Sequence, residues 1–179
     1  MTSPRMVRCV ALLRGVNVGG ISIKSADLAE LFRALGFENV RTVLASGNVV
    51  FDADAPDAAA LKLRIETALS ERFGYDAWIV LEPLSRVQSV IEQFPFDAQL
   101  DGWHPYVLFS SDAASLAELL AAVPTLDPAD EIVVEGDRVL YWHCRREVGV
   151  NSAFSKLTAK ARFRSTTTNR NLRTLMKLA

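Results

Sequence analysis

The chain has 179 residues, of which 50% are hydrophobic and 23% are charged, and its formal net charge is −1. This composition is typical of a globular protein with a substantial core, and the length fits one large domain or two small ones. No apolar run approaches the roughly 18 residues of a membrane span, so we expect neither such a span nor a signal peptide. Cys9 and Cys144 have neither disulfide nor zinc spacing, which predicts a reduced, cytoplasmic protein without a metal site.

The first half of the chain predicts the order strand, helix, two strands, helix, strand. Ser25 and Asp57 are typical of helix N-caps, and Gly36 and Gly74 of helix ends, around apolar residues at helical spacing. The predicted elements are a strand at 6–13, a helix at 25–36, strands at 40–44 and 49–51, a helix at 57–74 and a strand at 77–81.

The second half predicts the same order after a linking helix and loop, although no residue-level repeat is visible. Gly136 and Asp137 are typical of a two-residue hairpin turn. In the final helix Leu172, Leu175 and Met176 are expected to face inward. The predicted elements are a strand at 106–109, a helix around 116–123, strands at 131–135 and 138–143, a helix from 151 or 152 to 161, a short strand at 164–167 and a helix from about residue 169.

Each half therefore has the β-α-β-β-α-β order of the split βαβ motif. The predicted fold class is α+β, with two tandem ferredoxin-like halves, antiparallel sheets and a C-terminal helix. The expected domains are an N-terminal half at 1–82, a linking segment at 83–104 and a C-terminal half at 105–179 that ends in a basic helix.

Two glycine- and asparagine-rich turns form the candidate site. In a split βαβ unit the first two strands run parallel, so the loops that follow them lie at the same end of the sheet. Exposed backbone N–H groups beside an arginine and two asparagines suit an anion, whereas the alternative is two tight turns braced by amide hydrogen bonds. Neither a dinucleotide fingerprint nor a P-loop is present. The candidate ligand-binding residues here are Arg14, Gly15, Asn17, Gly19, Gly20, Ser46, Gly47 and Asn48.

Four segments stand out when taken together: V-A-L-L-R-G-V-N-V-G-G at 10–20, S-G-N-V-V-F at 46–51, S-K-L-T at 155–158 and R-N-L-R-T-L-M-K-L at 170–178. At this spacing they resemble the bacterial domain-of-unknown-function 1697 family. The resemblance implies a two-part α+β fold and no particular activity. It also singles out Lys156, Arg170 and Asn171 as ligand-binding candidates, although Leu172 and Arg173 replace the family's usual tryptophan and asparagine.

Residues 145–179 carry nine of the 20 basic residues and one acidic residue, Glu147. This asymmetry indicates either contact with phosphates or a basic segment packed on an acidic body. Lys156 and Lys160 are expected to project from one helix at i and i+4, with Phe154, Leu157 and Ala161 on its buried side. Because like charges at that spacing repel, an acidic partner or a bound anion is expected near Lys156.

Three classes of function remain. The first is a binding module for a phosphorylated or otherwise anionic small molecule at the two loops. The alternatives are nucleic-acid binding through the basic C-terminal segment and an enzyme of unknown reaction. His104 and His143 are the only histidines, which leaves little scope for general-base catalysis, and no cofactor or catalytic residue is assigned. His143 and Cys144 are neighbours in a predicted strand, so they are expected to point to opposite faces.

Overall fold

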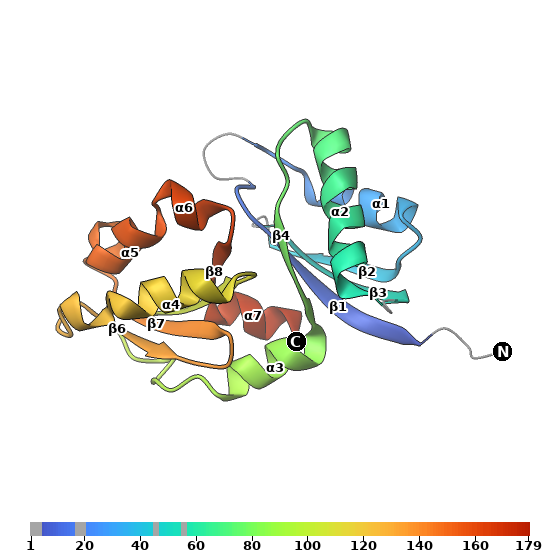
Figure 1. Cartoon of the computed structure of the whole chain (residues 1–179). Coiled ribbons are helices and arrows are strands. Elements are labelled where there is room, and N and C mark those ends of the chain that lie inside the picture. The colour runs from blue at the N-terminus through green and yellow to red at the C-terminus, as the bar shows by residue number, and fades with distance from the viewer. Residues whose placement is uncertain (1–4, 17–20, 45–46, 55–56) are drawn as a thin grey trace. The chain divides into compact units, whose positions relative to one another are not determined.

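The computed structural model describes residues 5–16, 21–44, 47–54 and 57–179. The chain divides into two compact units, Met1–Gln88 together with Lys177–Ala179, and Ser89–Met176. Each unit contains one four-stranded antiparallel sheet and helices, so the protein is α+β (Figure 1).

The first unit is built around a sheet with the strand order β2-β3-β1-β4. Its elements are β1 (Met6–Leu13), α1 (Ser25–Ala34), β2 (Glu38–Val43), β3 (Asn48–Asp54), α2 (Ala58–Phe73) and β4 (Ile79–Pro83), after which α3 (Leu84–Glu92) begins. Strand β3 pairs antiparallel with both β1 and β2, so β1 and β2 run in the same direction. Their C-terminal ends therefore lie at the same end of the sheet.

Helices α1 and α2 cover one face of this sheet (Figure 1). Alternate residues of β1, namely Cys9, Ala11 and Leu13, join the core beneath the helices, as the two-residue period of a strand requires. Phe32 of α1 and Phe51 of β3 meet edge to face, with ring centroids 5.1 Å apart. Cys9 is 4% exposed and fills this core as a small apolar side chain.

The helix ends of the first unit lie where the sequence predicts them, with one exception. The side chain of Asp57 caps α2 by accepting hydrogen bonds from the backbone N–H groups of Ala59 and Ala60. Gly74 ends α2 with a φ of +69°, a conformation that glycine adopts without strain. The prediction that Ser25 caps α1 is wrong: Lys24 occupies the N-cap position, and Ser25 is already the first helical residue.

The second unit has the strand order β6-β7-β5-β8, with β5 and β7 in the middle. Its elements are β5 (Trp103–Ser110), α4 (Ala113–Ala121), η1 (Val123–Thr125), β6 (Glu131–Glu135), β7 (Val139–Arg145), η2 (Gly149–Asn151), α5 (Ala153–Thr158), α6 (Ala161–Arg164), β8 (Thr167–Asn171) and α7 (Leu172–Leu178). Leu119 of α4, Phe154 of α5 and Phe163 of α6 share a core with Leu140 and Trp142 of β7.

The end of the chain differs from the prediction. The last strand lies at Thr167–Asn171 instead of 164–167, because the polar residues 169–171 continue the ladder with β5. Helix α7 consequently begins at Leu172, three residues later than expected. Leu172 and Leu175 are buried as predicted, whereas Met176 is 51% exposed and was wrongly placed in the core.

The β6–β7 turn is also shifted by one residue. The backbone N–H of Gly136 donates to the carbonyl of Val139 at 2.9 Å, so Asp137 and Arg138 are the central residues instead of Gly136 and Asp137. Arg138 has a φ of +57°, the conformation expected of the glycine. Gly136 is required for a different reason: a Cβ atom there would come within 2.5 Å of the Tyr141 ring.

Candidate functional site

The loop after β1 and the β2–β3 hairpin meet at one end of the first sheet. The backbone N–H of Leu13 donates to the carbonyl of Gly47 at 2.8 Å. The backbone N–H of Arg14 donates to the backbone carbonyl of Trp78 at 3.1 Å. We call the described part of this region, residues 14–16 and 47–48, the glycine corner. The candidates Asn17, Gly19, Gly20 and Ser46 lie outside the described residues.

The two glycines of the corner have different surroundings. Both have a positive φ, +71° at Gly15 and +75° at Gly47. Gly47 is buried, and a Cβ atom there would lie 2.8 Å from the Cβ of Leu13, so only glycine lets the two loops approach. Gly15 is exposed, and a Cβ atom there would meet nothing within 4 Å. The backbone at Gly15 is therefore open on that side.

Asn48 and Arg14 complete the described corner. Asn48 is fully buried, and its Nδ2 donates to the carbonyl of Val43 at 2.9 Å, which closes the hairpin. This bond satisfies a backbone carbonyl that burial would otherwise leave unpaired. Arg14 is half-buried directly beside the open Gly15.

The other candidate residues belong to the second unit. Arg170 is 8% exposed, and its Nη1 donates to Thr168 Oγ1 at 2.6 Å and to the carbonyl of Asn169 at 3.0 Å. The Oδ1 of Asn171 accepts from the backbone N–H of Arg173 at 2.9 Å, as a helix cap does. These contacts give both residues a structural role at the junction of β8 and α7.

Lys156 is exposed on α5, but its predicted pairing with Lys160 is wrong. Helix α5 ends at Thr158, and Lys160 is the N-cap of the next helix, α6. Ala161 is accordingly exposed, and Phe163 fills the core instead. Like-charge repulsion within one helix therefore gives no reason for an anion at Lys156.

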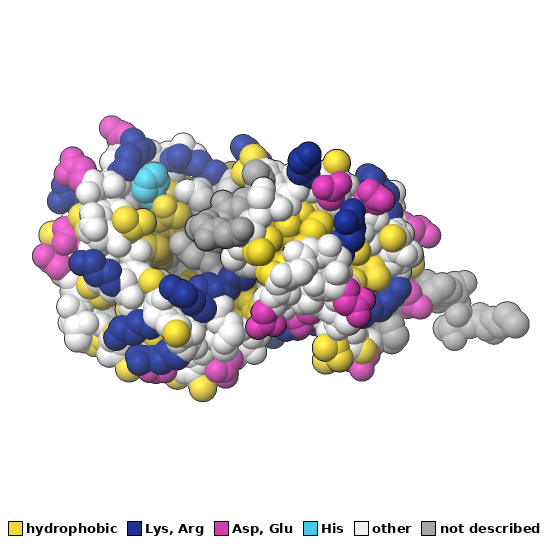
Figure 2. Space-filling view, turned by 90° about the horizontal axis from the view of Figure 1, so that it is seen from above, with side chains coloured by type: hydrophobic (Ala, Val, Ile, Leu, Met, Phe, Trp, Pro, Cys, Tyr) yellow, Lys and Arg dark blue, Asp and Glu magenta, His cyan; other side chains and the backbone are white. Residues whose placement is uncertain are grey.

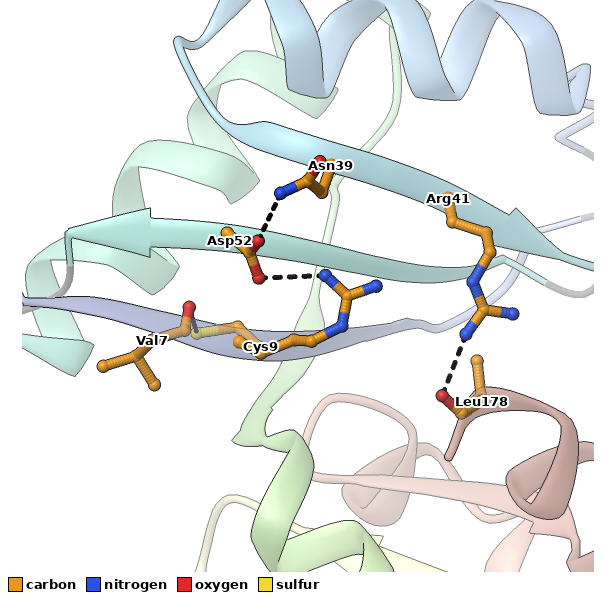
Figure 3. Close-up of polar contacts among 7 residues, drawn as sticks. Val7, Cys9, Asn39, Arg41, Asp52 and Leu178 are labelled. Atoms are coloured by element: carbon orange, nitrogen blue, oxygen red, sulfur yellow. Dashed lines mark hydrogen bonds and ion pairs between the residues drawn. The ribbon is translucent and has the colours of Figure 1, made fainter.

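A polar cluster on the first sheet was missed from the sequence (Figure 3). Asp52 accepts hydrogen bonds from Asn39 Nδ2 at 2.7 Å and from Arg8 Nη1 at 2.9 Å. The hydrogen bond from Asn39, aided by Arg8, lowers the pKa of Asp52 below its ordinary value, so the carboxylate stays ionised. No local signal indicated this pair, because Arg8 and Asp52 lie 44 residues apart and meet only through the pairing of β1 with β3. Arg41 separately donates to the carbonyl of Leu178 at 3.0 Å.

The thiols and His143 are poorly placed for catalysis. Burial raises the pKa of the Cys9 and Cys144 thiols, which disfavours the nucleophilic thiolate. His143 is 4% exposed and stacks on Phe96 with ring centroids 5.1 Å apart. Burial lowers its pKa, so the imidazole is neutral. Cys144 instead lies in the core beneath the helices, which confirms that these neighbours face opposite sides of the sheet.

Within the part of the chain that the structure describes, no group of three or more His, Cys, Asp or Glu side chains could hold a metal ion. None of the described helices has the length and apolar character needed to cross a membrane.

Comparison with known proteins gives a family and a fold. The conserved bacterial protein SP0830 from Streptococcus pneumoniae is 26% identical, with a TM-score of 0.79 over 97% of each chain. An unknown protein from Galdieria sulphuraria is 10% identical, with a TM-score of 0.29 over 93% of this chain and 98% of its own. No curated protein matches. The family model described as "Protein of unknown function (DUF1697)" matches residues 6–141, so the chain belongs to that family.

Proposed function

We propose that this protein is a binding module for a phosphorylated or otherwise anionic small molecule, held at the glycine corner. The open backbone at Gly15, next to the half-buried cation of Arg14, carries this proposal. A glycine that no packing contact requires leaves room for a ligand to approach main-chain N–H groups. The neighbouring bonds of Leu13 and Arg14 to other loops hold the corner in place, which reduces the ordering cost of binding.

We also infer that both units are versions of the ferredoxin-like arrangement. The order β2-β3-β1-β4 in the first unit corresponds strand for strand to β6-β7-β5-β8 in the second. A helix follows the first strand of each sheet, and helical segments precede its last strand. This correspondence supports two tandem copies of one topology, of which the first carries the glycine corner.

The test is a thermal-shift screen with inorganic phosphate, pyrophosphate and nucleoside monophosphates, each at constant ionic strength. We expect at least one anion to raise the Tm, because binding to the folded state stabilises it. Arg14→Gln should abolish that increase and leave the fold intact. Arg33→Gln, which alters an exposed arginine of α1, is the matched control and should keep it. The absence of any anion-specific increase, or its persistence in R14Q, would overturn the proposal.

A second candidate function is nucleic-acid binding by the basic C-terminal segment. Lys156 and Lys160 are exposed, and among the described residues neither ammonium group has a carboxylate partner. Figure 2 shows Lys and Arg side chains gathered on the face of the second unit seen there. Gel-shift binding of single-stranded RNA that weakens steeply with salt would support this function, because each neutralised phosphate releases counterions. No binding at low salt would exclude it.

A further inference from the structure

A histidine and two arginines gather at one end of the second sheet. His104 lies on the central strand β5, opposite Cys144 of β7. The same ladder continues for two residues, since the backbone N–H of Arg146 donates to the carbonyl of Gly102 at 2.7 Å. Arg146 thus follows Cys144 on the β7 side of His104.

Arg173 approaches His104 from the opposite side of β5. Tyr106 pairs with Asn171, the last residue of β8, so the chain leaves this strand toward the end of β5 that carries His104. The chain turns into α7 there, with Arg173 in its first turn. His104 is therefore flanked by one arginine from each neighbouring segment.

Two positive charges act on His104. Burial lowers the pKa of His104, and the positive charges of Arg146 and Arg173 lower it further. Both arginine side chains are exposed, and within the described residues neither has a carboxylate or other side-chain partner. The His104 Nδ1 is buried without a hydrogen-bond partner, which also disfavours the imidazolium, in which both nitrogens must donate. The cluster thus consists of a neutral imidazole between two permanent cations.

We propose that His104, Arg146 and Arg173 form a binding site for a phosphate group. Guanidinium groups bind phosphate oxygens in a bidentate manner, and two of them match the charge of a phosphate monoester at neutral pH. A bound dianion would give both guanidinium groups the anionic partner that neither has within the described part of the chain. The proposal uses residues of the second unit alone and does not depend on anion binding at the glycine corner of the first unit.

His104 itself provides the readout. The imidazole resonances of the whole chain are followed by NMR during a titration with inorganic phosphate, against chloride at equal ionic strength. The chain has two histidines, so His104→Gln assigns the signals and His143 serves as an internal reference. Phosphate should shift the His104 resonance saturably and raise its pKa, because a bound anion reverses the effect of the two cations. A shift no larger than that with chloride would overturn the proposal.

Variants distinguish a phosphate-binding site from two surface arginines that bind no ligand. Arg146→Gln and Arg173→Gln should each weaken phosphate binding at least about tenfold, as expected for loss of a charge-assisted hydrogen bond. The control is Arg162→Gln, an exposed arginine already paired with Glu118 at 2.7 Å, and it should leave the affinity unchanged. An equal loss in R162Q would overturn the proposal. Without ligand, R146Q should by itself raise the pKa of His104, and an unchanged pKa would show that the cluster does not exist.

The source of the phosphate is distinguished in the same assay. Glycerol 3-phosphate represents a small phosphate monoester, and a short single-stranded RNA represents a phosphate chain. A saturable His104 shift with the monoester supports a small-molecule ligand. Binding of RNA without a saturable shift from either phosphate or the monoester would contradict the proposed site.

Discussion

Glu131 and Trp142 are joined by a buried hydrogen bond, in which Trp142 Nε1 donates to Glu131 Oε1 at 2.9 Å. The other carboxylate oxygen accepts from the backbone N–H of Phe154 at 3.2 Å, in the first turn of α5. Glu131 is 2% exposed, so both of its oxygens replace water with protein donors. One side chain thereby ties β6, β7 and α5 together.

Replacing this carboxylate tests its role in the second unit. Glu131→Gln places an amide NH2 group against an N–H donor, so we expect the free energy of unfolding to fall by about 1–3 kcal/mol. Urea denaturation measures the change. Glu135→Gln, an exposed position on the same strand, should alter stability by less than about 0.5 kcal/mol. Equal effects would show that the two hydrogen bonds contribute nothing specific.

Gly136 has no positive φ, so the effect of replacing it measures only its close contacts, the nearest of which is with the Tyr141 ring. Gly136→Ala should cost roughly 1–3 kcal/mol, because the new methyl group meets the Tyr141 ring. The ring has little freedom to move, since the Tyr141 hydroxyl donates to the carbonyl of Val90 at 2.8 Å. In a Tyr141→Ala background only the contact at 2.9 Å with Val139 Cγ2 remains, so the same glycine substitution should cost less, and a double-mutant cycle measures the difference. An additive cycle would refute the steric explanation.

Gly15 and Gly47 both have a positive φ, but only Gly47 is closely packed, so the two can be compared directly. Gly47→Ala combines backbone strain with a clash against Leu13, so we expect a loss of more than about 2 kcal/mol. Gly15→Ala meets no neighbouring atom and should cost about 1 kcal/mol for the positive φ alone. Chemical denaturation of both variants gives the comparison. A larger loss for G15A than for G47A would contradict the described packing.

The buried His143 predicts a loss of stability in mild acid. Burial lowers its pKa in the folded state, against which Asp97 acts in part, so the unfolded chain takes up the proton more readily. This contribution to stability is present above the unfolded pKa of about 6.5 and is lost as the pH falls below it. His143→Phe keeps an aromatic ring on Phe96 and should flatten the decline between about pH 7 and pH 5. The comparison is made in a His104→Gln background, because His104 shifts in the same direction. An unchanged decline would exclude His143 as its cause.

Local patterns in the sequence determined most of the fold. Periodic apolar residues, the Asp57 cap and the helix-ending Gly74 predicted the elements of the first unit, because these signals act within one helical turn or one strand. The strand and helix order also predicted that β1 and β2 run parallel, which brings the described loops of the glycine corner together. The end of the chain was misjudged because residues 169–171 are polar, and their pairing with β5 overrides local propensity.

The chemistry around His104, Glu131 and Asp52 was decided by tertiary structure alone. Arg8 lies 44 residues from Asp52, and Phe154 lies 23 residues from Glu131. No local pattern encodes such pairs, because strand pairing brings them together only after the sheet has formed. Burial and hydrogen bonding likewise came only from the tertiary structure: Asn48 and Arg170 are buried, and their side chains donate to backbone carbonyls.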